Sequence, residues 1–193
     1  MEETELAEML ELKNNRGAVL AEWIIVFPLL LFFLLSIAQL GFMMNAKQTV
    51  TYAAYSTARV LLVSASGSSS GLQLSEKAKK AAALACIGIT GLANAKPYPP
   101  SSDPDIIHIA GRYSRDERSH ADFLQRYNAA LDKTRVNILD LSEEGQDVKV
   151  KIEVLHDYEL DFPIVNQFIA RLFSESSKYG SPHITLRSTV SLG

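Results

Sequence analysis

The feature that most constrains this chain is a run of 24 residues without a charged side chain, from Trp23 to Ala46. A helix of that length spans about 36 Å, whereas the hydrocarbon core of a bilayer is about 30 Å thick. The run therefore predicts a helix that crosses a membrane. Lys13 and Arg16 precede it. Basic residues beside a span stay in the cytoplasm, so we expect the N-terminus inside and the C-terminal portion outside.

The same helix is predicted to continue beyond the membrane, because residues 47–66 contain no Gly or Pro and carry an apolar stripe at helical spacing. The stripe consists of Val50, Ala54, Ala58, Leu61 and Leu62. The sequence GSSSG at 67–71 then ends the helix. A secretory signal has an apolar region of only about 7–15 residues, followed at once by its cleavage site. The length of the predicted helix therefore favours a permanent anchor or the N-terminal helix of a pilin-like subunit.

Glu22 is the anomaly at the start of the apolar run. Insertion scales assign an unfavourable free energy of about 2.5–3.5 kcal/mol to an Asp at the centre of a span, and a smaller one near an interface. A basic stretch (Lys13–Arg16), then Gly17, four small or apolar residues and Glu22 form an order that resembles a type IV prepilin processing site. The alternative is that the Glu22 side chain extends to the lipid headgroups.

This resemblance implies cleavage after Gly17, which makes Ala18 the new N-terminus and Glu22 its fifth residue. The freed α-amine is mostly protonated at neutral pH, so it can pair with the Glu22 carboxylate of a neighbouring subunit. Such a pair neutralises two charges that neither chain can bury alone. Pro28 lies within the same helix, where it predicts a local kink.

Two stretches of the chain carry a more specific pattern. The first, residues 16–60, has a Gly with a Glu after the cut, a leucine-rich run after a Pro, a polar-x-Gly near the end of the span and a closing Ala-Arg. These features are Gly17 and Glu22, Pro28–Leu31, Gln39–Gly41, and Ala58 with Arg59. The second, residues 148–192, has a V-x-V-x-V strand, an aromatic and apolar stretch with proline, a short helix and a terminal strand rich in Thr and Ser. Both resemble the TadE-like pseudopilins of the tight adherence (Tad, or Flp) pilus; residues 66–119 carry no specific match.

The resemblance implies a non-enzymatic minor pilin without a cofactor, held in the bacterial inner membrane with its N-terminus in the cytoplasm and its head outside, and later part of the pilus at the cell surface. The implied partners are a prepilin peptidase, a companion pseudopilin, the major Flp-type pilin, inner-membrane platform proteins and membrane lipid. Gly41 would let neighbouring helices approach closely. The resemblance thus implies a role in pilus assembly and surface attachment.

The predicted fold is α+β, with a long N-terminal helix that extends into a pilin-like head. We expect a leader (1–17), a transmembrane and assembly helix (18–46), a helical part of the head (47–133) and a β-sheet part (134–193). Helices are predicted from Ser75 and over 115–133, a Pro-rich loop over 96–104, and a short helix over 164–175. Period-two alternation predicts antiparallel strands over 134–141, 147–160 and 183–192, with Val148, Val150, Ile152 and Val154 on one face of the second strand.

Composition bounds the alternatives. The net charge of −3 resides in residues 1–17, so the rest of the chain is neutral and has no basic excess for nucleic acid. The only cysteine, Cys86, cannot form an intramolecular disulfide, and the four histidines make no HxxxH or HExxH pair for a metal. The rival hypothesis is an unprocessed single-pass protein with an extracytoplasmic sensor or adhesin domain. A membrane-tethered hydrolase is a third class, which would need convergent polar residues in the head.

Overall fold

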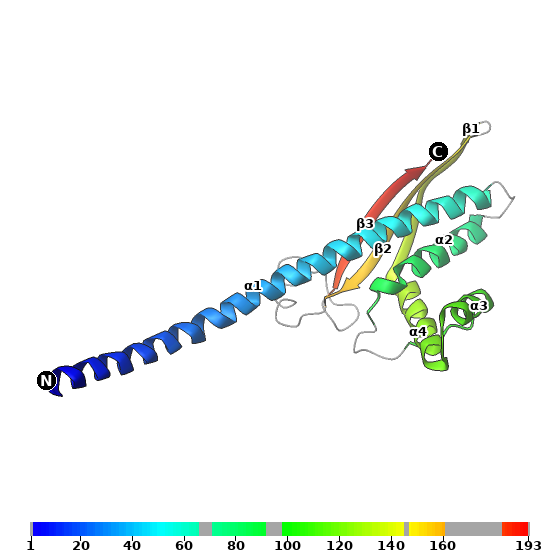
Figure 1. The fold of residues 1–193 in the computed structure, drawn as a ribbon. Helices are drawn as coiled ribbons and strands as arrows, with labels where there is room; N and C mark the ends of the chain where they lie inside the picture. The colour runs from blue at the N-terminus through cyan, green and yellow to red at the C-terminus, as the bar shows by residue number, and fades with distance from the viewer. Residues whose placement is uncertain (1, 66–70, 92–97, 145–146, 161–182, 193) are drawn as a thin grey trace.

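The fold is taken from a computed structural model, which describes residues 2–65, 71–91, 98–144, 147–160 and 183–192. A single helix, α1 (Glu2–Ala65), forms a rod whose N-terminal half projects away from the rest of the chain (Figure 1). Its 64 residues correspond to about 96 Å. The helix continues through Pro28. Among the described residues it is the one helix long and apolar enough to cross a membrane.

The sheet contains three antiparallel strands in the order β1-β2-β3. Strand β1 covers Thr134–Glu144, β2 covers Asp147–Glu159 and β3 covers His183–Leu192. The central strand aligns Ile152 with Ile138 on one side and with Val190 on the other. Val150, Ile152 and Val154 are fully buried on one face, which confirms the predicted alternation.

A register shift between Ile138 and Asp140 interrupts the pairing of β1 with β2. Leu139 is the extra residue, and its side chain is exposed. A bulge of this kind twists the strand and disturbs its packing beyond that point. Leu141 pairs with the buried Val150 and so lies on the same face of the sheet, yet its side chain is 42% exposed. Strict alternation from Val136 and Ile138 would place Leu141 on the outer face, and the extra residue Leu139 returns it to the inner one.

Helix α2 (Gly71–Cys86) lies beside the second half of α1, and both helices cover the inner face of the sheet (Figure 1). The resulting core contains residues of α1, α2, β2 and β3. The contribution of α1 is dominated by alanines, which leave little side-chain volume between its backbone and its neighbours. Its buried residues in this core are Ala46, Val50, Ala53, Ala54, Ala58 and Leu61.

A smaller core joins α2 to α3 (Pro104–Tyr113) and α4 (Glu117–Lys133), and its buried members include Ala83, Ile106 and Tyr127. A short 3-10 helix, η1 (Ile87–Ile89), follows α2. Asp103 caps α3 by accepting a hydrogen bond from the Asp105 backbone, and Pro104 takes the first helical position. Asp103 also forms an ion pair with Lys80 of α2 at 2.6 Å, which ties α3 to α2.

The structure confirms the α+β fold class, with one long apolar helix, further helices and three antiparallel strands. Two predicted boundaries are wrong. Helix α2 begins at Gly71, four residues before Ser75. The Pro-rich stretch 96–104 does not remain a loop to its end, because Pro104 opens α3, a helix that the sequence analysis did not anticipate. The helix predicted over 164–175 lies outside the described residues.

Candidate functional site

The candidate site is helix α1, on which the structure places every site residue that the sequence predicts. Gly17 and Ala18 lie within the helix, and Glu22 follows Ala18 by about one turn. From residue 18 to residue 65 the only charged side chains are Glu22, Lys47 and Arg59. All three are exposed. The structure does not bring Glu22 close to another predicted site residue except along this helix.

Helix α1 changes its environment at Gln39. None of residues 20–38 is buried, and the exposed side chains there include Trp23, Phe27 and Phe33. Gln39 is completely buried, and it opens the buried stripe that continues through Ala46 and Val50. The free part from Leu20 to Ala38 is about 28 Å long, close to the thickness of a hydrocarbon core. The head therefore begins on the helix where a membrane-sized apolar segment ends.

The Gln39 side chain carries an unusual cost. Both its amide nitrogen and its amide oxygen are buried, and within the described structure neither atom has a hydrogen-bond partner. Burial of an unpaired amide costs roughly 1–3 kcal/mol in proteins. In the sequence, Gln39 stands out only as the polar residue of the polar-x-Gly motif. Its burial depends on the packing of the head, which the helix pattern alone does not reveal.

Pro28 and Gly41 both face outward. A Cβ atom added to Gly41 would meet nothing within 4 Å. The absence of a side chain at Gly41 therefore serves no contact within the described part of this chain. The packing role of Gly41 and the kink at Pro28 remain predictions.

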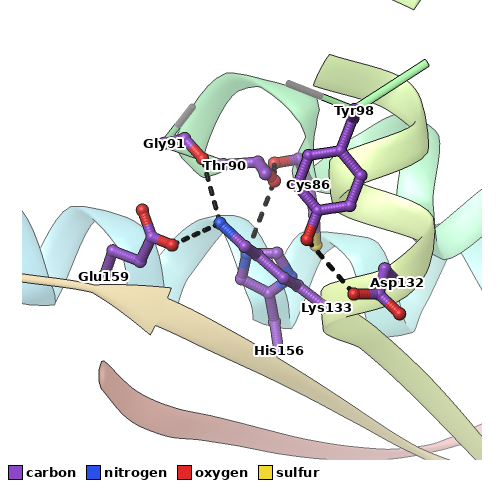
Figure 2. A network of polar contacts seen from close by, with 8 residues as sticks. All are labelled: Cys86, Thr90, Gly91, Tyr98, Asp132, Lys133, His156 and Glu159. Carbon is purple, nitrogen blue, oxygen red and sulfur yellow. Dashed lines mark hydrogen bonds and ion pairs between the residues drawn. The ribbon is translucent and has the colours of Figure 1, made fainter. Parts of the chain in front are cut away.

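A buried polar network lies at the end of the head that faces the free half of α1. This end is where α2 and β2 finish and where β1 and β3 begin. Lys133, the last residue of α4, points between Glu159 and the chain after η1 (Figure 2). The Lys133 Nζ atom lies 2.6 Å from Glu159 Oε1 and 3.0 Å from the Gly91 carbonyl oxygen. Both charged side chains are almost completely buried, so each depends on the other for compensation.

His156 belongs to the same network. Its Nδ1 atom lies 2.9 Å from Thr134 Oγ1, and its Nε2 atom lies 3.5 Å from Thr90 Oγ1. Burial, reinforced by the positive charge of Lys133, lowers the pKa of His156 to about 4. The imidazole is therefore neutral at neutral pH. Burial raises the pKa of the nearby Cys86 thiol to about 12, which makes this cysteine a poor nucleophile.

The network connects α4, β1, β2 and the chain after η1, and its ionisable side chains are buried. No group of three metal-binding side chains occurs among the residues that the structure describes. No sequence pattern indicated the roles of Lys133 and Glu159, and the spacing of the histidines bears only on metal binding. Alternation along β2 was the available signal, because it places His156 on the same face as Val154.

The comparisons with known proteins bear directly on α1. The family model of the TadE-like proteins matches residues 17–59. Residues 17–59 form a TadE-like segment. No curated protein and no solved structure matches the chain.

The TadE-like segment begins at Gly17 and ends at Arg59, so it contains the whole free part of α1 and most of the part that packs in the head. It includes no residue of the sheet. The match relates this segment to proteins associated with the Tad pilus. The match and the apolar helix together indicate that the segment anchors the chain in a membrane.

The low pKa of His156 predicts a pH dependence of stability. Between about pH 6.5 and pH 4 the unfolded chain takes up a proton at this position and the folded chain does not. The free energy of unfolding therefore falls as the pH is lowered through this range, by up to about 3 kcal/mol from this group. We expect His156→Gln to flatten this part of the profile, as measured by denaturant titration of the detergent-solubilised chain.

Val154→Ala is the matched control, because it removes buried volume from the same strand without removing a titratable group. It should lower stability at every pH and leave the slope unchanged. Equal slopes for the wild-type chain and His156→Gln would contradict the assignment.

Proposed function

We propose that this protein is a minor pilin, or pseudopilin, that takes part in the assembly of a Tad-type pilus. The observation that carries the proposal is the division of one helix at Gln39 into a free apolar half and a half that packs in the head. The free part from Leu20 to Ala38 has the length of a membrane span and contains one charge, Glu22. The family match to residues 17–59 supports the same reading.

The first step of the proposed function is processing. The chain enters the inner membrane with its N-terminus in the cytoplasm, and a prepilin peptidase cuts after Gly17. Residues 1–17 carry five acidic and two basic side chains, so cleavage removes the whole net charge of −3 from the chain. The new terminus at Ala18 places a positive α-amine on the helix that carries Glu22.

The second step is assembly through α1. In the membrane, lipid covers the side chains from Leu20 to Ala38. In a fibre, the helices of other subunits must cover them instead, since apolar surface of this extent is unstable in water. The Glu22 carboxylate pairs with the α-amine of a neighbouring subunit, so neither charge enters the bundle alone. Gly41, where an added Cβ would meet nothing within 4 Å, permits close helix contacts there.

The head then supplies specific contacts. The proposed partners are a companion pseudopilin, the major Flp-type pilin and inner-membrane platform proteins, with the head outside the cytoplasm and the assembled subunit in the pilus at the cell surface. The rival hypothesis is an uncut single-pass anchor with a sensor or adhesin head. Processing separates the two, because an anchor of that kind keeps its first 17 residues.

Processing predicts a defined mature chain. In a host that carries the cognate prepilin peptidase, the intact mass should correspond to residues 18–193. Gly17→Arg should keep the leader attached, because a large cation replaces the smallest side chain at the cut. Arg16→Gly is the matched control, since it changes the flank and leaves Gly17 in place. A wild-type chain that retains Met1 in assembled material would contradict the proposal.

The Glu22 pairing predicts a separation between insertion and assembly. Glu22→Ala should insert into the membrane at least as well as the wild-type chain, because it removes a carboxylate from the span. Its recovery in sheared fibres should fall by at least about tenfold, the factor for a loss of 1.4 kcal/mol.

Glu76→Ala, which removes an exposed carboxylate from α2, is the control and should assemble normally. Wild-type recovery of Glu22→Ala in fibres would overturn the pairing. The masses of both variants also show whether they are processed, so a failure of cleavage is distinguished from a failure of assembly.

A further inference from the structure

The outer face of α1 carries an open groove in the part of the helix that packs in the head. The groove is lined by residues of α1 alone, namely Tyr52, Tyr55, Arg59, Val60 and Val63 with two serines. These residues lie on the side of the helix opposite its buried stripe, which includes Val50, Ala54 and Leu61. Tyr52 is 67% exposed and Val63 is 71% exposed. Large apolar and aromatic side chains are thus exposed together on this face of the helix.

Lipid cannot cover this surface when the free part of α1 spans the membrane. The free part ends at Ala38, and Tyr52 lies 14 residues, or about 21 Å, further along the helix. This distance exceeds the thickness of one headgroup region, since a bilayer of about 40–45 Å has a core of about 30 Å. The groove therefore stands outside the bilayer, where exposed apolar surface indicates a protein partner.

Charge restricts what the partner can be. Arg59 is the one charged side chain of the groove, and within the described structure no ion pair is recorded for it. Two copies of α1 placed side by side at the same height would bring Arg59 against Arg59, which is unfavourable. From residue 18 to residue 65 the one acidic side chain is Glu22. A staggered second copy can therefore offer Arg59 a carboxylate.

We infer that the groove binds the N-terminal end of α1 from a second copy of this chain, with Glu22 of that copy against Arg59. The inference rests on the proposed assembly through α1. The stagger is 37 residues, which corresponds to about 55 Å along the helix axis. In this register Trp23 lies level with Val60, so the free aromatic end meets the apolar lining of the groove. A carboxylate has two oxygens, so Glu22 can accept hydrogen bonds from Arg59 of one copy and from the α-amine of a neighbouring subunit.

Lys47 is the other cation on this helix, and its surroundings make it a poorer partner for Glu22. Its Nζ atom already donates a hydrogen bond to the Arg187 carbonyl oxygen of β3. Lys47 also lies outside the groove. The Arg59 guanidinium has a planar set of donors suited to a carboxylate, and it is flanked by side chains that can bury Trp23.

The test is a disulfide between copies. The full-length chain carries Trp23→Cys and Val60→Cys, and assembled material is oxidised and run without reductant. A bond within one chain is impossible, because the two positions are about 55 Å apart on one helix and a disulfide requires Cα atoms within about 7 Å. We expect a ladder of disulfide-linked dimers and higher oligomers on the gel. Trp23→Cys with Tyr113→Cys is the matched control, because Tyr113 is highly exposed on α3 and should give no ladder.

Arg59→Glu provides a second measurement on the otherwise wild-type chain. We expect normal cleavage and at least a tenfold loss from fibres, while Arg59→Lys retains part of the recovery and the exposed Arg112→Glu retains all of it. A cleaved chain that enters fibres without the ladder, or with Arg59→Glu at wild-type levels, overturns this inference and leaves the proposed function intact. A chain that is neither cleaved nor assembled overturns the proposed function itself.

Discussion

Everything in this molecule depends on one helix that serves two environments. From Leu20 to Ala38 no side chain of α1 is buried, and from Gln39 onward one face of α1 is core. The change is abrupt because the small residues Ala46, Ala53 and Ala54 let the sheet and α2 lie directly on the helix. The head therefore has no complete core without α1, and its position along the rod is fixed by packing.

This dependence couples the anchor to the head. A rigid helix transmits the position of its free end to the head, whereas a flexible linker would let the two move independently. The buried pair Lys133–Glu159 and the neutral His156 close the head at the end that faces the free half of α1. The groove around Arg59 lies on the opposite side of the same helix from the core. One helix thus presents three surfaces, for lipid, for its own head and, as we infer, for another copy.

Sequence patterns predicted the parts of this fold that follow from strong periodicity. The uncharged run predicted the apolar helix, and alternation predicted β2 and its buried valines. Helix α3 was missed because its N-terminus lies in a Pro-rich stretch, where Pro104 opens a helix only because Asp103 caps it. The burial of Gln39 and the Lys133–Glu159 pair could not be predicted, since both depend on contacts between distant segments. Glu22 could be singled out, because a carboxylate in an apolar run is costly in any fold.

We propose that the part of α1 from Leu20 to Ala38 lies in the membrane and that the head lies outside the cytoplasm. Labelling of spheroplasts with a membrane-impermeant maleimide tests it directly, since the native Cys86 is buried and unreactive. We expect Tyr113→Cys to be labelled in intact spheroplasts and Leu31→Cys only after detergent is added. Labelling of Leu31→Cys without detergent, or protection of Tyr113→Cys until the membrane is opened, would contradict the account.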